Sequence, residues 1–345
     1  MRPIVERLAE LTGLRDRDAL DVSLLSALAE LSGARRVALH RLVGEDPGRR
    51  WLMRAHVEAA AAGGHTEVQI EPLWADLRGQ PRFDERPDWR DCLLSQQARA
   101  WRPTEATSLF PLWVDETPVA IIELETAQAL TPTMRKHALA LLQVMRNQIG
   151  MLDYSERDTL TSLLNRKSFD ESFYRASAPL PVAVLTDDEA RRRESPLRYW
   201  LAVVDIDHFK LVNDGFGHLI GDEVLLLVAR VMRGSFRFYD QLYRFGGEEF
   251  VLLLRCGNEQ DAMLAFERFR TRVEAYLFPQ VKHITVSIGF TDVRTGDSPT
   301  AAVERADQAV YYAKHNGRNQ VRCREALRRD GLLADEEKSS DVELF

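Results

Sequence analysis

Residues 244–250, RFGGEEF, constrain the fold of this chain more than any other segment. The adjacent glycines Gly246 and Gly247 separate an apolar approach from a β-rich exit, which is typical of a tight hairpin because glycine takes positive φ at no steric cost. The carboxylates Glu248 and Glu249 follow the turn directly, so one projects to each face of the strand. Accessible backbone beside two acids suits a metal-bound polyphosphate, although the pattern alone is more typical of a solvent-exposed hairpin.

A second acidic element lies upstream, where the short apolar run 201–204 ends in Asp205-Ile206-Asp207. The run is long enough for one buried strand. Carboxylates at a strand end, with the Ile206 carbonyl between them, offer hard oxygen ligands for Mg2+. An isolated Asp-x-Asp is a weak signal, so this element gains meaning only in combination with the hairpin.

Asn213 and Asp222 follow the second acidic element, beside a segment that is helical in pattern from 223 to 233. A carboxylate accepts hydrogen bonds from the N1–H and N2–H groups of guanine, and an amide both donates and accepts. The two residues therefore suit a purine edge. An Asn-Asp pair followed by glycine is also typical of a helix-capping turn.

Further segments of the same kind occur in a fixed order along the chain. They are 158–166 (DTLTSLLNR), 205–210 (DIDHFK), 213–214, 217–218, 221–222, 246–250, 285–289 (TVSIG), 306–311, 313–314 and 317–319. Together they resemble the GGDEF family, whose members are diguanylate cyclases that join two GTP molecules into cyclic di-GMP. The resemblance covers residues 154–323. The third motif position is Glu248 rather than Asp, a variant that the family tolerates because either carboxylate can bind Mg2+.

The resemblance implies the fold and the roles of the site residues. The expected fold is α/β (α+β), with a mainly antiparallel central sheet flanked by helices. Mg2+, with Mn2+ as an alternative, would be bound by Asp205, the Ile206 carbonyl and Glu248. The catalytic positions are Glu248, Glu249 and Lys210, and the sequence does not separate base from ligand. The positions expected to contact GTP are Asn213, His218, Asp222, Lys314 and Arg318.

Arg237 and Asp240 precede the hairpin with the spacing of the family's product-inhibition site. An arginine fork can hold a phosphate and stack on guanine, and an aspartate can accept from guanine N–H groups. Arg268 is the weaker candidate for a third contact. The alternative for Arg237 and Asp240 is a surface ion pair.

Residues 1–130 are predicted to form a separate unit. The expected elements are a helix at 18–31, a hairpin of 37–43 with 51–57, a helix near 89–98, and a strand pair of 108–113 with 118–124. This order resembles a GAF domain, a small-molecule sensing fold, and a PAS-like sensor is the alternative. The sensor ligand stays unknown: Cys92, His40 and His65 are residue types that hold bilins or haem, but lone residues of these types are more often ordinary core or surface positions. A ligand-free domain that only dimerises is the other alternative.

The joint, residues 131–157, is predicted to be a signalling helix. Ala138, Leu142, Met145, Ile149 and Leu152 recur in steps of four and three, the pattern of a parallel two-helix coil. The alternative is a helix that packs on its own sensor domain. A coil would suit a homodimer, because each active site holds one GTP and two protomers must face each other to form a two-fold symmetric product.

Length and composition fit this organisation and exclude several functions. At 345 residues the chain is expected to hold more than one domain, with the catalytic domain at 158–328. A net charge of −7 argues against a nucleic-acid binder. The sequence predicts no membrane span, and three scattered cysteines fit a cytoplasmic protein. The charged segment 186–196 is expected to be an exposed loop or short helix, and the acidic tail 329–345 to be disordered.

The sequence is compatible with three functions. An active diguanylate cyclase, regulated by its N-terminal domain and by its product, leads. A catalytically silent domain that binds GTP or cyclic di-GMP is the alternative, and the presence of Asp205, Glu248, Glu249 and Lys210 argues against it. A purely dimerising scaffold would not need these acids.

Overall fold

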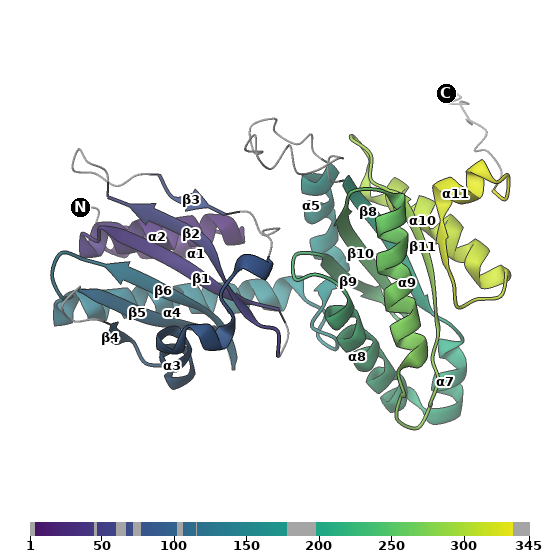
Figure 1. Cartoon of the computed structure of the whole chain (residues 1–345), viewed down its shortest axis with the longest axis horizontal. Helices are drawn as coiled ribbons and strands as arrows, with labels where there is room; N and C mark the ends of the chain where they lie inside the picture. Colours follow the sequence, from purple (N-terminus) through teal and green to yellow (C-terminus); the bar gives the residue numbers. More distant parts are fainter. Residues whose placement is uncertain are drawn as a thin grey trace, which may run out of the picture. The chain divides into compact units, whose positions relative to one another are not determined.

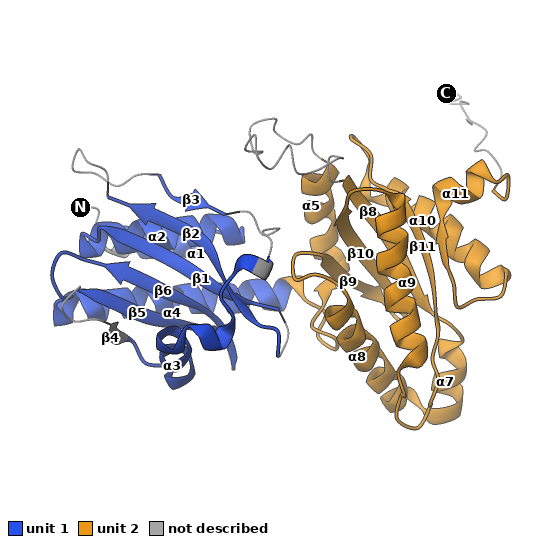
Figure 2. Cartoon of the chain, in the orientation of Figure 1, with its two compact units in different colours: residues 1–155 blue, residues 156–345 orange. Residues whose placement is uncertain are grey.

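The computed structural model describes residues 4–44, 47–59, 67–71, 77–101, 106–114, 116–177 and 198–333. The chain separates into two compact units, residues 1–155 and residues 156–345 (Figure 2). The predictions for His65, for the charged segment 186–196 and for most of the acidic tail lie outside the described residues. Of the described helices, none is both long and apolar enough to cross a membrane.

An antiparallel sheet forms the centre of unit 1 (Figure 1). Its strand order is β3-β2-β1-β6-β5-β4. The strands are β1 (Arg36–Val43), β2 (Arg50–Glu58), β3 (Gln69–Ile70), β4 (Arg99–Trp101), β5 (Thr107–Val114) and β6 (Thr117–Glu125). The two predicted strand pairs are confirmed, since β1 pairs with β2 and β5 pairs with β6.

Helices cover both faces of this sheet. They are α1 (Ile4–Gly13), α2 (Arg17–Ser32), α3 (Pro87–Ser95) and α4 (Pro132–Glu156), with short 3-10 turns η1 (Leu77–Gly79) and η2 (Phe83–Glu85). Along β6, Ala120 and Ile122 join the cluster of α1, α2 and α4, whereas Ile121 packs with Trp89 of α3. Because successive strand residues face opposite sides, α3 lies across the sheet from the other three helices. The GAF-like assignment stays a prediction.

The apolar stripe of α4 faces its own domain. Ala138, Leu142, Met145, Ile149 and Leu152 are all buried in the cluster that α1 and α2 form with the sheet. The prediction that these positions are the seam of a two-helix coil is therefore wrong. A stripe spaced by three and four residues looks the same in sequence whether it covers a sheet or a partner helix.

A second sheet organises unit 2, with the order β12-β11-β8-β10-β9-β7. Its strands are β7 (Leu164–Asn165), β8 (Arg198–Ile206), β9 (Gln241–Gly246), β10 (Glu249–Cys256), β11 (Val286–Asp292) and β12 (Val321–Cys323). The helices are α5 (Arg166–Ser177), α7 (Phe209–Phe216), α8 (His218–Ser235), α9 (Glu259–Ala275), α10 (Pro299–His315) and α11 (Arg324–Arg329). The central pairings β8–β10, β8–β11 and β9–β10 are antiparallel, as predicted, while β7–β9 and β11–β12 are parallel.

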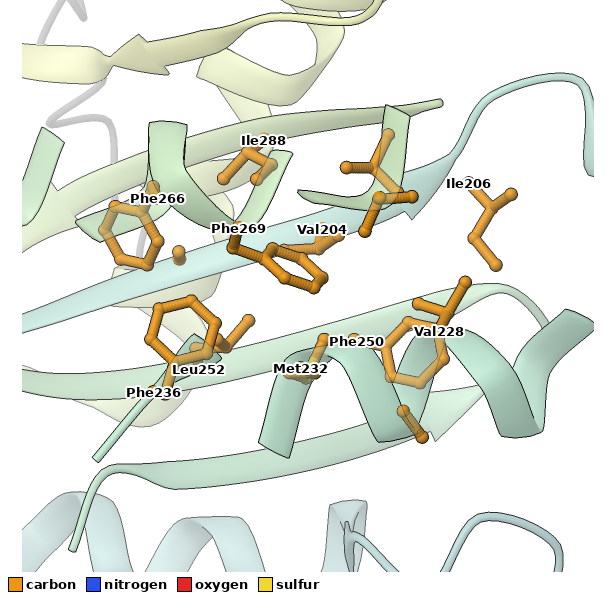
Figure 3. Close-up of a cluster of buried hydrophobic side chains, with 14 of the residues drawn as sticks. Val204, Ile206, Val228, Met232, Phe236, Phe250, Leu252, Phe266, Phe269 and Ile288 are labelled. Atoms are coloured by element: carbon orange, nitrogen blue, oxygen red, sulfur yellow. The ribbon is translucent and has the colours of Figure 1, made fainter. Parts of the chain in front are cut away.

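The central strands of unit 2 are buried on both faces, which explains their continuous apolar runs. Val204 of β8 and Phe250 of β10 pack with α8 and α9, where Figure 3 shows Phe266 and Phe269 in the same cluster. Val203, the neighbour of Val204, packs on the other side with α5 and α10. The sheet is thus held between two helical layers, and its strand ends are left to carry polar side chains.

Candidate active site

The two acidic motifs meet where β8 ends and β10 begins. Asp205 of β8 lies opposite Glu249 of β10 on one side and opposite Ser287 of β11 on the other. Glu248 occupies the turn directly before β10. Asp205 is buried, Glu248 is half-buried and Glu249 is exposed. The sheet register therefore brings together the acids that the sequence separates by about forty residues.

The predicted hairpin is present, and its turn needs glycine. β9 pairs antiparallel with β10, with an irregularity between Glu249 and Phe250. Gly246 has φ 145° and Gly247 has φ 51°, both outside the range that other residues adopt freely. A side chain at either glycine would meet no atom within 4 Å, so the need is conformational and the backbone stays open to a ligand.

Lys314 reaches this cluster from α10. Its Nζ lies 2.7 Å from Asp205 Oδ2. The helix comes this close because β11 carries Gly289, where an added Cβ would lie 2.3 Å from both Ala306 O and Val310 N. The sequence predicts a contact to phosphate for Lys314, and the structure places its ammonium against the buried acid.

The carboxylates repel one another. Burial raises the pKa of Asp205, and the Lys314 ammonium opposes this shift. Burial and the charge of Asp205 raise the pKa of Glu248. Burial and the charge of Glu249 raise the pKa of Asp307, on α10, to about 6. Sequence reasoning gave Asp307 no role, although a spacing of seven places it on the Lys314 face of the helix.

A hard divalent cation fits this set of groups. Among the described residues, no three His, Cys, Asp or Glu side chains are arranged to hold a metal ion. The predicted ligands are instead two carboxylates, Asp205 and Glu248, and the Ile206 carbonyl, all oxygens of the kind that Mg2+ prefers. After burial, the charges of neighbouring carboxylates also raise the pKa values of Asp205 and Glu248, and the Lys314 ammonium already lies beside Asp205, so positive charge is favoured here.

Asp207 serves the site indirectly. It accepts hydrogen bonds from Thr285 Oγ1 at 2.7 Å, from Ser287 Oγ at 2.7 Å and from the Asn319 backbone N–H at 3.0 Å. These bonds tie the end of β8 to β11 and to the loop after α10. The exposed Arg318, with φ 58°, lies in that loop. The carboxylate of Asp207, the second acid of the Asp-x-Asp element, therefore already accepts hydrogen bonds from three groups of the protein.

The residues predicted to recognise guanine lie on two consecutive helices. Asn213 is half-buried on α7, and Asp222 is exposed on α8. Gly221 makes room for Asn213, because a Cβ at Gly221 would lie 2.0 Å from Asn213 Oδ1. α8 begins at His218, earlier than the predicted 223, so exposed His218 and Asp222 share its first turns. Lys210 is exposed on α7.

Similarity to known proteins covers the part of the chain that carries this site. Residues 155–320 match the model of the family described as "Diguanylate cyclase, GGDEF domain". This part of the chain belongs to the GGDEF family. The diguanylate cyclase DgcZ of Escherichia coli K12 is 36% identical over 172 residues, which are 49% of this chain and 53% of the relative. The diguanylate cyclase DgcP of Pseudomonas aeruginosa is 40% identical over 167 residues, 48% of this chain and 23% of the relative.

A solved structure gives a likeness of similar extent. The GGDEF domain of DgcB from Caulobacter crescentus, crystallised in complex with c-di-GMP, is 34% identical, covers 50% of this chain and 94% of its own, and has a TM-score of 0.43. The chain spans about half the length of DgcZ and about a quarter of DgcP. The family match begins at residue 155, so it adds nothing to the prediction for residues 1–130.

The predicted product site of the GGDEF domain lies at the end of α8. The Asp240 carboxylate accepts from the backbone N–H of Arg237 at 2.8 Å. The exposed Arg237 guanidinium donates to the Tyr239 hydroxyl at 2.6 Å. Arg268, on α9, donates to the Ser235 carbonyl at 2.7 Å. The three predicted residues thus surround one turn, where burial raises the pKa of Asp240 to about 6.

Proposed function

We propose that this protein is a diguanylate cyclase, which condenses two GTP molecules into cyclic di-GMP and two pyrophosphates. The observation that carries this proposal is the convergence of Asp205, Glu248 and Glu249 beside Lys314 in a domain of the GGDEF family. The proposal is supported by relatives that are named diguanylate cyclases. The comparisons cover about half of the chain, and the proposal assigns the activity to the whole chain.

The chemistry is a displacement at phosphorus. The 3'-hydroxyl of one GTP attacks the α-phosphorus of the other, the bond to the β-phosphate oxygen breaks, and pyrophosphate leaves with the electron pair. The hydroxyl proton passes to Glu248 or Glu249. Mg2+ or Mn2+ at Asp205, the Ile206 carbonyl and Glu248 would stabilise charge on the phosphate oxygens and lower the pKa of the attacking hydroxyl.

The remaining residues hold the substrate. Asn213 and Asp222 pair with the guanine edge, and His218 lies near the nucleotide. Lys210, Lys314 and Arg318 offset the charge of the triphosphate. The open backbone of the glycine turn lets the phosphates approach closely.

Catalysis requires a homodimer, because one domain binds one GTP and the product contains two in a symmetric ring. The outward face of α4 is the proposed contact, since its inward stripe is buried. Leu139, Met151 and Tyr154 on that face are 44%, 63% and 83% exposed. Gln143 lies four residues after Leu139 and Gly150 lies four residues before Tyr154, so they share this face and suit contact with a partner helix.

Regulation is proposed at two places. Cyclic di-GMP binds at Arg237, Asp240 and Arg268 and inhibits the enzyme. The arginine side chains hold its phosphate groups and stack on guanine. The N-terminal unit, GAF-like in its predicted order, responds to a ligand of unknown identity in the cytoplasm, where GTP is supplied. A domain that binds GTP or cyclic di-GMP without turnover is the second candidate.

One assay tests the proposed function. The purified full chain is incubated with GTP and Mg2+, and the products are separated by chromatography. We expect cyclic di-GMP and pyrophosphate in a ratio of one to two, and none from an Asp205→Asn variant. Binding of GTP or cyclic di-GMP without any product would favour the silent receptor.

A further inference from the structure

Arg244 connects the active-site turn to the beginning of unit 2. It lies on β9, just before the two glycines. Its Nε and Nη2 donate to the Gly247 carbonyl oxygen at 3.1 and 2.9 Å. Its Nη1 donates to Asp158 Oδ1 at 3.1 Å and to Oδ2 at 3.2 Å. One guanidinium therefore joins the glycine turn to Asp158, which lies 86 residues before Arg244 in the sequence.

Asp158 is itself held in place. Its Oδ1 accepts from the Thr161 N–H at 2.8 Å and from Thr161 Oγ1 at 2.7 Å. Arg233 of α8 donates to the Thr161 carbonyl. β7, which follows this turn, pairs with β9 so that Asn165 lies opposite Arg244. The connection is a charge-assisted network, with the Arg244 and Asp158 side chains only 13% and 21% exposed.

A contact to the Gly247 carbonyl affects the neighbouring residue Glu248. The carbonyl shares one planar peptide unit with the N–H of Glu248, so holding the oxygen also sets the direction from which the Glu248 side chain starts. Two consecutive glycines have little conformational restriction of their own. Without an external contact, the turn would sample several backbone conformations.

We propose that Arg244 and Asp158 are positioning residues, which hold the Gly246–Gly247 turn in the conformation that the reaction needs. The proposal rests on the proposed cyclase function. It also names a route for regulation, because α4 ends at Glu156, two residues before Asp158.

Steady-state kinetics test this role with Asp158→Asn, Arg244→Gln and the double variant. We expect kcat to fall about tenfold or more in each single variant, as small misplacements of reacting groups do, with KM changed less than about threefold. The double variant should be no slower than Arg244→Gln, because both changes break the same connection. The matched control is Asp297→Asn, which breaks the similarly buried Arg305–Asp297 ion pair at 2.6 Å and should leave kcat unchanged.

Amide hydrogen exchange gives a readout that does not depend on activity. In peptides that contain residues 246–250, exchange should be about tenfold faster in Asp158→Asn than in the parent protein and unchanged in Asp297→Asn, because opening of the turn is a local event. Variants that keep kcat within about twofold of the parent would overturn the positioning role, whatever the exchange rates. A parent protein without cyclase activity whose turn still loosens in Asp158→Asn would refute the proposed function and support the structural connection.

Discussion

Asp205 and Asp207 stand one residue apart at the end of β8, yet they have different surroundings. Asp207 accepts hydrogen bonds from Thr285, Ser287 and Asn319 and is satisfied by the protein. Asp205 faces Lys314 and the carboxylates of the hairpin. An exchangeable ammonium and a raised pKa fit an acid that binds a cation, whereas three fixed donors fit an acid that holds the fold together.

Glu248→Gln should abolish turnover without loss of stability. It removes a proposed metal-binding charge, so kcat should fall by at least about 100-fold. Because the pKa of Glu248 is raised in the folded protein, its ionised form disfavours folding at neutral pH, and removing the charge should not lower the melting temperature. Product chromatography and a thermal melt measure the two effects. Normal synthesis of cyclic di-GMP by this variant would contradict the site assignment.

Inhibition by cyclic di-GMP should weaken as the pH falls. Burial raises the pKa of Asp240 to about 6, so its carboxylate, the proposed acceptor for guanine N–H groups, is lost as the pH drops through 6 rather than 4. The inhibition constant should be flat above pH 7 and rise by up to about tenfold per pH unit below 6. Initial rates with added cyclic di-GMP measure it.

Asp240→Asn is the control for this pH dependence, because its inhibition constant should be high and independent of pH. Arg237→Ala should raise the constant by about ten- to a hundredfold at every pH, the cost of a lost charged contact. A parent protein whose inhibition constant is the same at pH 8 and pH 5 would contradict the role of Asp240.

At the scale of elements, the contact of α10 with β11 decides whether Lys314 can reach Asp205. Gly289 is the point of closest approach, because an added Cβ would lie 2.3 Å from two backbone atoms and 2.8 Å from a third, Ala309 C. Backbone atoms cannot move aside as the end of a flexible side chain can. The helix must shift as a whole if this glycine is replaced.

Gly289→Ala should therefore destabilise the protein and reduce activity together. We expect a loss of about 1–3 kcal/mol in the free energy of unfolding, typical of an overpacked core, with a lower kcat as Lys314 moves from Asp205. Denaturant unfolding and the cyclase assay measure the two effects. Gly234→Ala is the control, since an added Cβ on α8 meets no atom within 4 Å and alanine favours a helix. Equal stability of the two variants would contradict the close contact.

At the scale of the whole molecule, α4 belongs to the core of unit 1, and the chain continues from its end into unit 2. Its two faces therefore have different tasks. The inward face, which includes Ile149, is buried and stabilises unit 1. The outward face, with Met151 and Tyr154, is exposed and is the proposed contact with a second copy.

Charged replacements should separate these tasks. Met151→Glu with Tyr154→Glu should weaken the dimer, so that kcat per protomer depends on protein concentration while the melting temperature is kept. Ile149→Glu should instead unfold unit 1, because it buries an unpaired charge. Light scattering, activity against concentration and thermal melts distinguish them. A Met151→Glu/Tyr154→Glu variant that stays dimeric would contradict the assignment of the outward face.

The elements that could be predicted from the sequence are those with a local signal. The hairpin at Gly246–Gly247 follows from what glycine backbone allows, and the buried strands follow from short continuous apolar runs. The ordered motifs predicted the GGDEF family. Each turn, strand or motif is encoded by residues that are neighbours in the chain, and the order of the motifs is part of the sequence itself.

Which partner each residue contacts could not be predicted from the sequence, because it depends on packing between distant segments. An apolar stripe specifies burial but not the surface that covers it, so only packing shows that α4 lies on its own sheet. An Asp-x-Asp element specifies two acids but not their neighbours, so only sheet register separates Asp205 from Asp207. The contact of Arg244 with Asp158 and Gly247 likewise depends on the folded chain. Pairing between distant segments is a property of the whole fold, because it is the sum of many packing contacts that no single segment encodes.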